Sequence, residues 1–215
     1  MKYLKLFCML LLVYSTSYSQ IRIRASMGVD YVSTPSLYDY INQNYSASSN
    51  DLGSFKAAVN FSGEIDYAVT ENYEVGIDFA YRLYSYTTSF GLQKYEMAYY
   101  NLMPDIVNYY VINGDGYQFK FGGGVGLRFL SVDETLPTIN TADSYSSSGF
   151  GFLIRGTGNT RIGTDLYANI NFDARYDING EPEYNGKKIT NNVTKTPVNF
   201  NSLSIGLSLG LTYFL

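Results

Sequence analysis

The final stretch of the chain, residues 203–215, alternates large apolar residues with small or polar ones. An alternation with a period of two is typical of a β-strand whose two faces meet different surroundings. One face requires an apolar environment along its whole length, whereas the side chains of the other face are small and mostly polar. A strand of a soluble sandwich can show the same pattern, so its meaning depends on the partners that the rest of the chain supplies.

Seven further segments alternate in a similar way, which predicts an all-β chain with eight strands. The fourth of these segments is the least regular, because Pro104 lies in its middle and removes a ladder hydrogen bond. We therefore expect a bulge or a change of register at Pro104. The predicted strands cover residues 21–34, 55–70, 73–83, 95–112, 117–129, 145–157, 162–176 and 203–215.

The polar faces of these segments carry basic and acidic residues in nearly equal numbers, and the apolar faces of the clean segments carry no charge. A balanced set of charges fits a narrow interior in which ions pair, because an unpaired buried charge is costly. The expected interior cluster is Glu64, Asp66, Glu74, Asp78, Arg82, Lys120, Arg128, Asp165, Asp173 and Arg175. The side chains expected to face outward include Val59, Phe61, Ile77, Phe79, Phe121, Val125, Ile170, Leu207 and Leu209.

Short connections (71–72, 113–116 and 158–161) alternate with longer ones (35–54, 89–94, 131–144 and 177–197). Eight strands joined in this way, ending in an apolar alternating strand, resemble the small outer-membrane β-barrels of bacteria, of the OmpA/OmpX type. The chain departs slightly from that pattern, because it ends in Leu215 with Phe214 one place earlier. The resemblance implies an eight-stranded antiparallel up-and-down transmembrane β-barrel spanning residues 20–215. It also implies lipid around the barrel, turns in the periplasm and loops outside the cell.

Residues 1–19 are predicted to be a secretory signal peptide. Lys2 and Lys5 form its basic start, an apolar core follows, and the small residues before Gln20 form a cleavage site. Cys8, the only cysteine, lies within this core, so the exported chain is expected to lack thiols. We therefore expect a protein of the bacterial outer membrane.

Little in the sequence points to catalysis. The chain has no histidine, whereas the outer-membrane barrel enzymes that hydrolyse or transfer acyl chains use one. The glycine run 122–126 lacks the Lys-Ser/Thr pair of a phosphate-binding loop. We expect no enzyme activity, no cofactor and no metal site. A formal net charge of −4 also argues against a nucleic-acid partner.

Eight strands enclose an interior that side chains fill. The favoured hypothesis is therefore a barrel with a closed, charge-paired lumen, whose extracellular loops serve surface structure or bind an unidentified extracellular or envelope partner. The alternative is a narrow channel or transporter for a small or hydrophobic molecule. Within the first long loop, a short helix after Thr34 and an irregular loop are both compatible with the sequence, and such a helix would lie at the membrane interface or over the mouth of the barrel. The expected binding surface joins two loops through Tyr38, Tyr40, Tyr45, Tyr184, Lys187 and Lys188.

Overall fold

The computed structural model describes residues 21–45, 56–90, 93–137 and 141–215. The predicted signal peptide and part of the first long loop lie outside these described residues. Within them, no helix has the length and the apolar character needed to cross a membrane.

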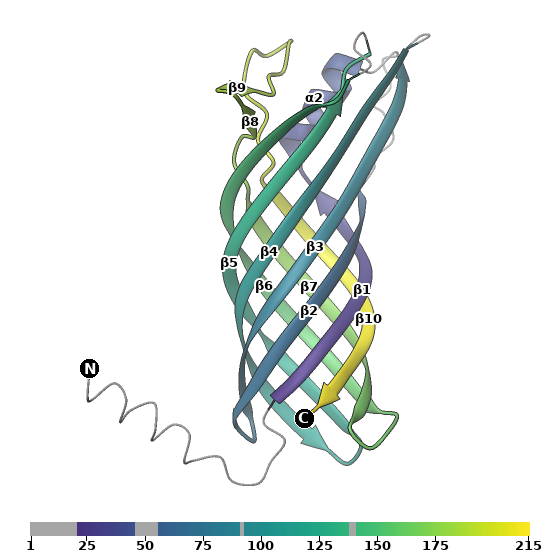
Figure 1. Ribbon diagram of the computed structural model, residues 1–215, viewed down its shortest axis with the longest axis vertical. Helices are drawn as coiled ribbons and strands as arrows, with labels where there is room; N and C mark the ends of the chain where they lie inside the picture. Colours follow the sequence, from purple (N-terminus) through teal and green to yellow (C-terminus); the bar gives the residue numbers. More distant parts are fainter. Residues whose placement is uncertain (1–20, 46–55, 91–92, 138–140) are drawn as a thin grey trace, which may run out of the picture.

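Eight long antiparallel strands form a closed barrel (Figure 1). The order around the wall is β5-β4-β3-β2-β1-β10-β7-β6, and β6 pairs with β5 to close the circle. The predicted fold class is therefore confirmed. A two-stranded hairpin, β8 (Glu183–Tyr184) and β9 (Lys187–Lys188), stands above the wall. The long strands are β1 (Ile21–Ser33), β2 (Ala57–Thr70), β3 (Tyr73–Phe90), β4 (Gln93–Gly114), β5 (Tyr117–Thr135), β6 (Asp143–Arg161), β7 (Leu166–Ile178) and β10 (Ser202–Phe214).

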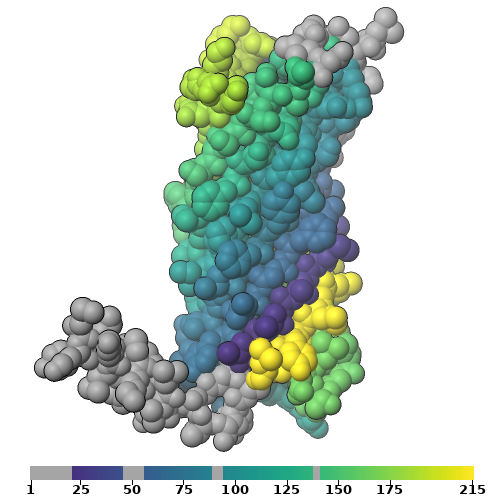
Figure 2. Space-filling model, viewed as in Figure 1, coloured from purple at the N-terminus to yellow at the C-terminus, as the bar shows by residue number. Residues whose placement is uncertain are grey.

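The first and last strands meet at a seam. Their antiparallel register runs from the pair Arg22↔Phe214 to the pair Ser33↔Leu203 without a shift. Figure 2 shows the two strands side by side at one end of the wall, and the backbone N–H of Leu215 donates to the carbonyl of Ile21 at 2.9 Å. The alternating C-terminal stretch is thus the strand that completes the barrel.

The alternation points the apolar residues outward and the charged residues inward. Leu209 is 64% exposed on the outer surface, whereas Arg128 in the interior is completely buried. A soluble barrel has the opposite distribution, with an apolar interior. The outward prediction is confirmed for Val59, Phe61, Ile77, Phe79, Phe121, Val125, Ile170, Leu207 and Leu209, all of which are exposed.

The predicted irregularity at Pro104 is wrong. β4 keeps one register along β3, where Pro104 lies opposite Phe79. On the β5 side the pairs stop at Leu102↔Phe129 and resume in the same register with Asp105. Proline removes a donor without adding a residue, so the ladder loses pairs and the strand does not slip.

The third short turn lies four residues later than the sequence indicated. β6 continues through the glycine-containing stretch to Arg161, and Thr160 still pairs with Tyr117. The turn occupies residues 162–165. Glycines taken as turn residues are strand residues here, because the barrel wall provides a paired neighbour on both sides of them.

Two of the predicted long connections, 89–94 and 131–144, are partly taken up by strands. β3 and β4 pair as far as Phe90↔Gln93, and β5 and β6 pair as far as Glu134↔Asp143. The wall formed by β3–β6 therefore rises higher than the wall formed by the other strands (Figure 1).

The first long loop contains a helix, α2 (Pro35–Tyr45), which settles the choice that the sequence left open. Pro35 occupies the first helical position, where a missing N–H costs nothing, and Tyr38 N–H donates to the Thr34 carbonyl at 3.0 Å. Leu37 and Ile41 on its apolar face are buried. The helix lies in the mouth of the barrel, at the end from which β8 and β9 project (Figure 1).

Candidate functional site

The barrel interior holds a column of buried charged side chains contributed by seven of the eight wall strands, and β10 adds only hydroxyl-bearing side chains to it. Every residue of the predicted interior cluster except Asp165 is buried within it. Asp165 is exposed in the turn before β7. Its assignment was wrong because the turn lies later than predicted, which removes Asp165 from the strand alternation.

The end of the column nearest the short turns centres on Lys120. Its ammonium group contacts Asp66, lies 3.0 Å from a Glu74 carboxylate oxygen, and lies 3.5 Å from Glu64. Arg22 also pairs with Glu74. Three carboxylates from β2 and β3 therefore surround one lysine that comes from β5.

Glu64 occupies the middle of the column. One of its oxygens accepts hydrogen bonds from Arg24 at 2.6 Å, Arg155 at 2.7 Å and the Tyr109 hydroxyl at 2.8 Å. These donors come from β1, β6 and β4, so the contacts cross the full width of the lumen. Asp78 forms a second centre, 3.0 Å from Arg155 and 3.1 Å from Arg175.

The upper part of the column links Arg82 and Arg128 through Asp177. Arg82 lies 2.8 Å from Asp30 and 3.0 Å from Asp177, while Arg128 also pairs with Asp105 at 2.8 Å. Asp177 and Asp105 were missed as interior residues. The signal for Asp177 was present, since it continues the inward spacing of Asp173 and Arg175.

Above the charges, an apolar layer fills the mouth. Tyr45 of α2 stacks on Tyr95 of β4 with ring centroids 3.9 Å apart. Phe200, from the last long loop, packs edge-on against Tyr99 at 5.8 Å. The buried layer consists of Val32, Leu37, Tyr40, Ile41, Tyr45, Ala58, Tyr84, Tyr95, Met97, Tyr99, Leu130, Val132, Ile189, Val198 and Phe200.

One carboxylate lies within this apolar layer. Glu134, near the C-terminal end of β5, is buried and accepts hydrogen bonds from Tyr40 at 2.6 Å and Tyr95 at 2.9 Å. Burial raises the pKa of Glu134, although the two hydroxyls oppose the shift. Tyr40 belongs to α2 and Tyr95 to the wall, so Glu134 ties the helix to the barrel.

The predicted aromatic and basic loop surface does not form as expected. Tyr40 and Tyr45 lie on the buried face of α2, because a helical spacing turns them toward the barrel. Tyr184, Lys187 and Lys188 are exposed on the β8–β9 hairpin. The two loops are nevertheless neighbours, since Asn44 of α2 donates to Asn191 at 3.1 Å.

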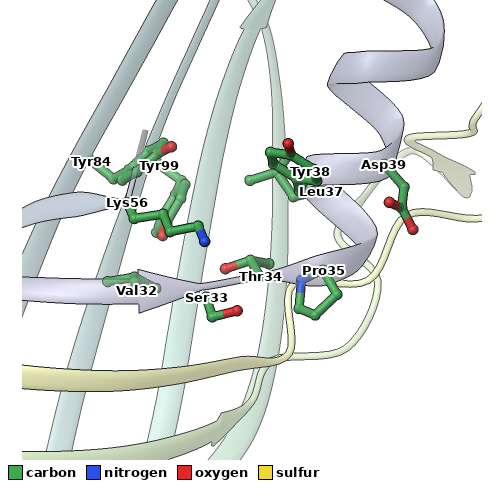
Figure 3. A pocket seen from close by; sticks show the side chains of 10 residues that line it. All are labelled: Val32, Ser33, Thr34, Pro35, Leu37, Tyr38, Asp39, Lys56, Tyr84 and Tyr99. Atoms are coloured by element: carbon green, nitrogen blue, oxygen red, sulfur yellow. The ribbon is translucent and has the colours of Figure 1, made fainter. Parts of the chain in front are cut away.

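Tyr38 lies beside a small cavity of about 200 Å³ at the first turn of α2. Its walls include the stacked rings of Tyr84 and Tyr99, whose centroids are 4.5 Å apart. Figure 3 shows Lys56 extending from the side of these rings toward Thr34 and the helix. A larger groove of about 580 Å³ lies on the other side of the same turn. The described residues contain no cluster of side chains suited to a metal ion.

No family model matches the chain, and no curated protein matches it. Similar solved structures include Neisserial surface protein A, at 12% identity and a TM-score of 0.48, with 91% of this chain and 97% of that chain covered.

Ail, the attachment invasion locus protein of Yersinia pestis, is 14% identical in its complex with the heparin analogue sucrose octasulfate. Its TM-score is 0.46, with 90% of this chain and 98% of that chain covered. The outer membrane protease OmpT of Escherichia coli is 10% identical, with a TM-score of 0.49 and coverages of 94% and 99%. By its own strand pairing and burial, this chain is a small eight-stranded barrel of the outer-membrane type.

Proposed function

We propose that this protein is an integral outer-membrane barrel with a closed lumen, which presents its extracellular end for surface structure or binding. The observation that carries the proposal is the double obstruction of the interior. A column of paired charges fills the barrel, and α2 packs into the mouth above it. The apolar layer lies above the column, so a solute would have to displace both.

The lipid partner follows from the outer surface. Exposed apolar side chains occur on every wall strand, and water would not stabilise such a surface. Export through a signal peptide cleaved after Ser19 and insertion into the outer membrane are parts of the same proposal. Fractionation tests them, because a folded barrel recovered with the outer membrane should change its gel mobility on heating. A mature protein recovered in the soluble fraction would contradict the proposal.

A narrow transport path is the competing function, and conductance separates the two. The purified protein in a planar bilayer should give no stable conductance above that of the bare bilayer. Replacing Leu37 and Ile41 by Asp should expel α2 from the apolar layer, and the charge column should still block the path. Stable conductance of the unmodified protein would favour the transport function instead.

We also propose that the protein has neither a catalytic role nor a nucleic-acid partner. The absence of histidine from the sequence removes the commonest general base. The net negative charge opposes binding to phosphate backbones. Assaying the purified barrel for lipid hydrolysis and for proteolysis tests the first statement, and turnover in either assay would overturn it.

A further inference from the structure

A groove of about 580 Å³ separates α2 from the last long loop. On the helix side it is lined by Ser36, Asp39 and Gln43, whose spacing places them on one face of α2. This face differs from the one that packs into the barrel mouth. The groove is therefore formed by the solvent-facing side of α2, and a ligand can enter it while α2 stays docked in the mouth.

Hydrogen bonds between the two sides hold the groove in shape. Asn191 donates to the side-chain oxygen of Gln43 at 2.9 Å, and the backbone N–H of Asn199 donates to the Ser36 hydroxyl at 3.1 Å. Asn191 also accepts the backbone N–H groups of Val193 at 2.9 Å and Thr194 at 3.3 Å, which fixes the turn of the loop. A site whose walls are already ordered loses little entropy when it binds a ligand.

The chemistry of the lining is specific. Most of the lining side chains carry a neutral hydroxyl or carboxamide group, and Asp39 is the only charged residue among those that line the groove. Hydroxyls and carboxamides both donate and accept hydrogen bonds, and an exposed carboxylate accepts from neighbouring hydroxyl groups. A lining without a cation does not suit an anion, whereas it suits a ligand that carries many hydroxyl groups.

The lower rim of the groove has a different character. Tyr176 of β7 and Leu203 of β10 lie directly opposite each other in the wall, and both face outward. Their exposed fractions are 48% and 55%. A tyrosine at the border of an apolar band is amphipathic, with an apolar ring and a polar tip. The groove thus begins where the lipid-facing surface ends, and it becomes polar toward the extracellular end.

From this gradient we propose that the groove binds the neutral saccharide headgroup of a glycolipid in the surrounding leaflet. The sugar hydroxyl groups would contact Asp39, Gln43 and the asparagines of the loop. The ring of Tyr176 would meet the apolar face of a sugar, while the acyl chains remain beside Leu203. This inference rests on the proposed function only in requiring that the barrel is inserted with this end at the outer leaflet.

The test uses the full-length barrel in phosphatidylcholine nanodiscs that also contain a neutral galactosyl diacylglycerol or, separately, phosphatidic acid. Native mass spectrometry then measures which lipid stays bound to the released protein. We expect the galactolipid to be retained and phosphatidic acid not to be enriched. Preferential retention of phosphatidic acid, or no retention of the galactolipid, would overturn the proposal.

A double variant, Asp39→Ala with Gln43→Ala, removes two groups of the helix side. Both residues are exposed and alanine favours a helix, so α2 should stay docked. Galactolipid retention should fall roughly tenfold, since each lost hydrogen bond weakens binding severalfold. Asp115→Asn in the short turn at the opposite end is the matched control and should retain the lipid. Unchanged retention in the double variant would contradict the assignment of the site.

A second variant, Thr196→Trp, fills the groove from the loop side and should also abolish retention. Soluble galactose oligosaccharides, added to nanodiscs without galactolipid, test whether the groove binds a free saccharide instead of a lipid headgroup. Strong binding of the free oligosaccharide would overturn the lipid source. Heat-modifiable mobility and conductance measured on the same preparations report on the proposed function independently, so its failure is distinguishable from a failure to bind saccharide.

Discussion

Tyr40, in the middle of α2, donates a 2.6 Å hydrogen bond to Glu134, a carboxylate buried near the C-terminal end of β5. Tyr95 of β4 donates to the same oxygen at 2.9 Å. The other titratable groups around Glu134 and these hydroxyls are Tyr45 of α2 together with Asp143 and Tyr145 of β6. We therefore expect the docking of the helix to depend on pH.

The first prediction concerns that sensitivity. Because burial raises the pKa of Glu134 above its ordinary 4.5, the docked state holds a proton that the undocked carboxyl releases. Its contribution to docking is fully present below pH 4.5 and is lost as pH rises through the raised pKa. In a Tyr38→Trp variant, acrylamide quenching of the single tryptophan should therefore increase over this range of pH. Adding Glu134→Gln should flatten the profile, and an unchanged slope would exclude Glu134 as the cause.

The second prediction concerns the charge column. Glu64→Gln keeps the shape of the side chain but removes one of the two carboxylates that Arg24 and Arg155 share, and Asp78 remains as the other. Losing one member of a buried ion pair costs about 3–5 kcal/mol. Urea unfolding of the refolded barrel should show a loss of this size. Asp165→Asn, in the exposed turn, should change the free energy of unfolding very little, and equal losses in both variants would contradict the burial assignment.

The third prediction tests the outer surface. Leu207 and Val193 are both exposed, at 55% and 63%, but one lies on the wall and the other in the last loop. Leu207→Arg should destabilise the barrel by roughly 2–4 kcal/mol in a bilayer, because the charge meets hydrocarbon. Val193→Arg should be nearly neutral, because that position meets water. Reversible unfolding in liposomes measures both, and a neutral Leu207→Arg would place this surface outside the membrane.

The fourth prediction concerns a close approach between β4 and β5. A Cβ added at Gly126 would meet the carbonyl oxygen of Pro104 and the backbone of Asp105, so one strand would have to shift. At Gly63 a Cβ would lie 3.9 Å from the nearest atom, the Arg24 carbonyl oxygen. Gly126→Ala should therefore lower the yield of heat-modifiable barrel, and Gly63→Ala should not. Equal yields would show that the wall adapts at Gly126.

The parts of the structure that could be predicted from the sequence are those governed by periodicity. Strand alternation determined which residues face outward and which face the lumen, because successive side chains point to opposite faces. The alternation failed for Asp165, where glycines within β6 were taken for a turn. A glycine is compatible with a strand and with a turn, and only pairing with the neighbouring wall strands decides between the two.

The mouth was harder to predict, because its contacts join residues that are distant in sequence. The spacing of Leu37 and Ile41 indicated a helix face, but nothing local decided between a helix at the membrane interface and one over the mouth. Glu134 was assigned to a loop, since β5 extends beyond its clean alternation through pairing with β4 and β6. The groove also depends on contacts such as Asn191 with Gln43, which are separated by 148 residues.

The seam between β1 and β10 has a kinetic consequence. Every other neighbouring pair of wall strands is joined by one connection, whereas these two are separated by almost the whole chain, and closing so long a loop is slow. Until β10 arrives, β1 and β7 both present open edges, which are prone to pair with other chains. An intermediate that lacks only this strand would already contain most of the wall. Its lifetime, rather than the stability of the finished barrel, is expected to set how much of the chain is lost to aggregation during assembly.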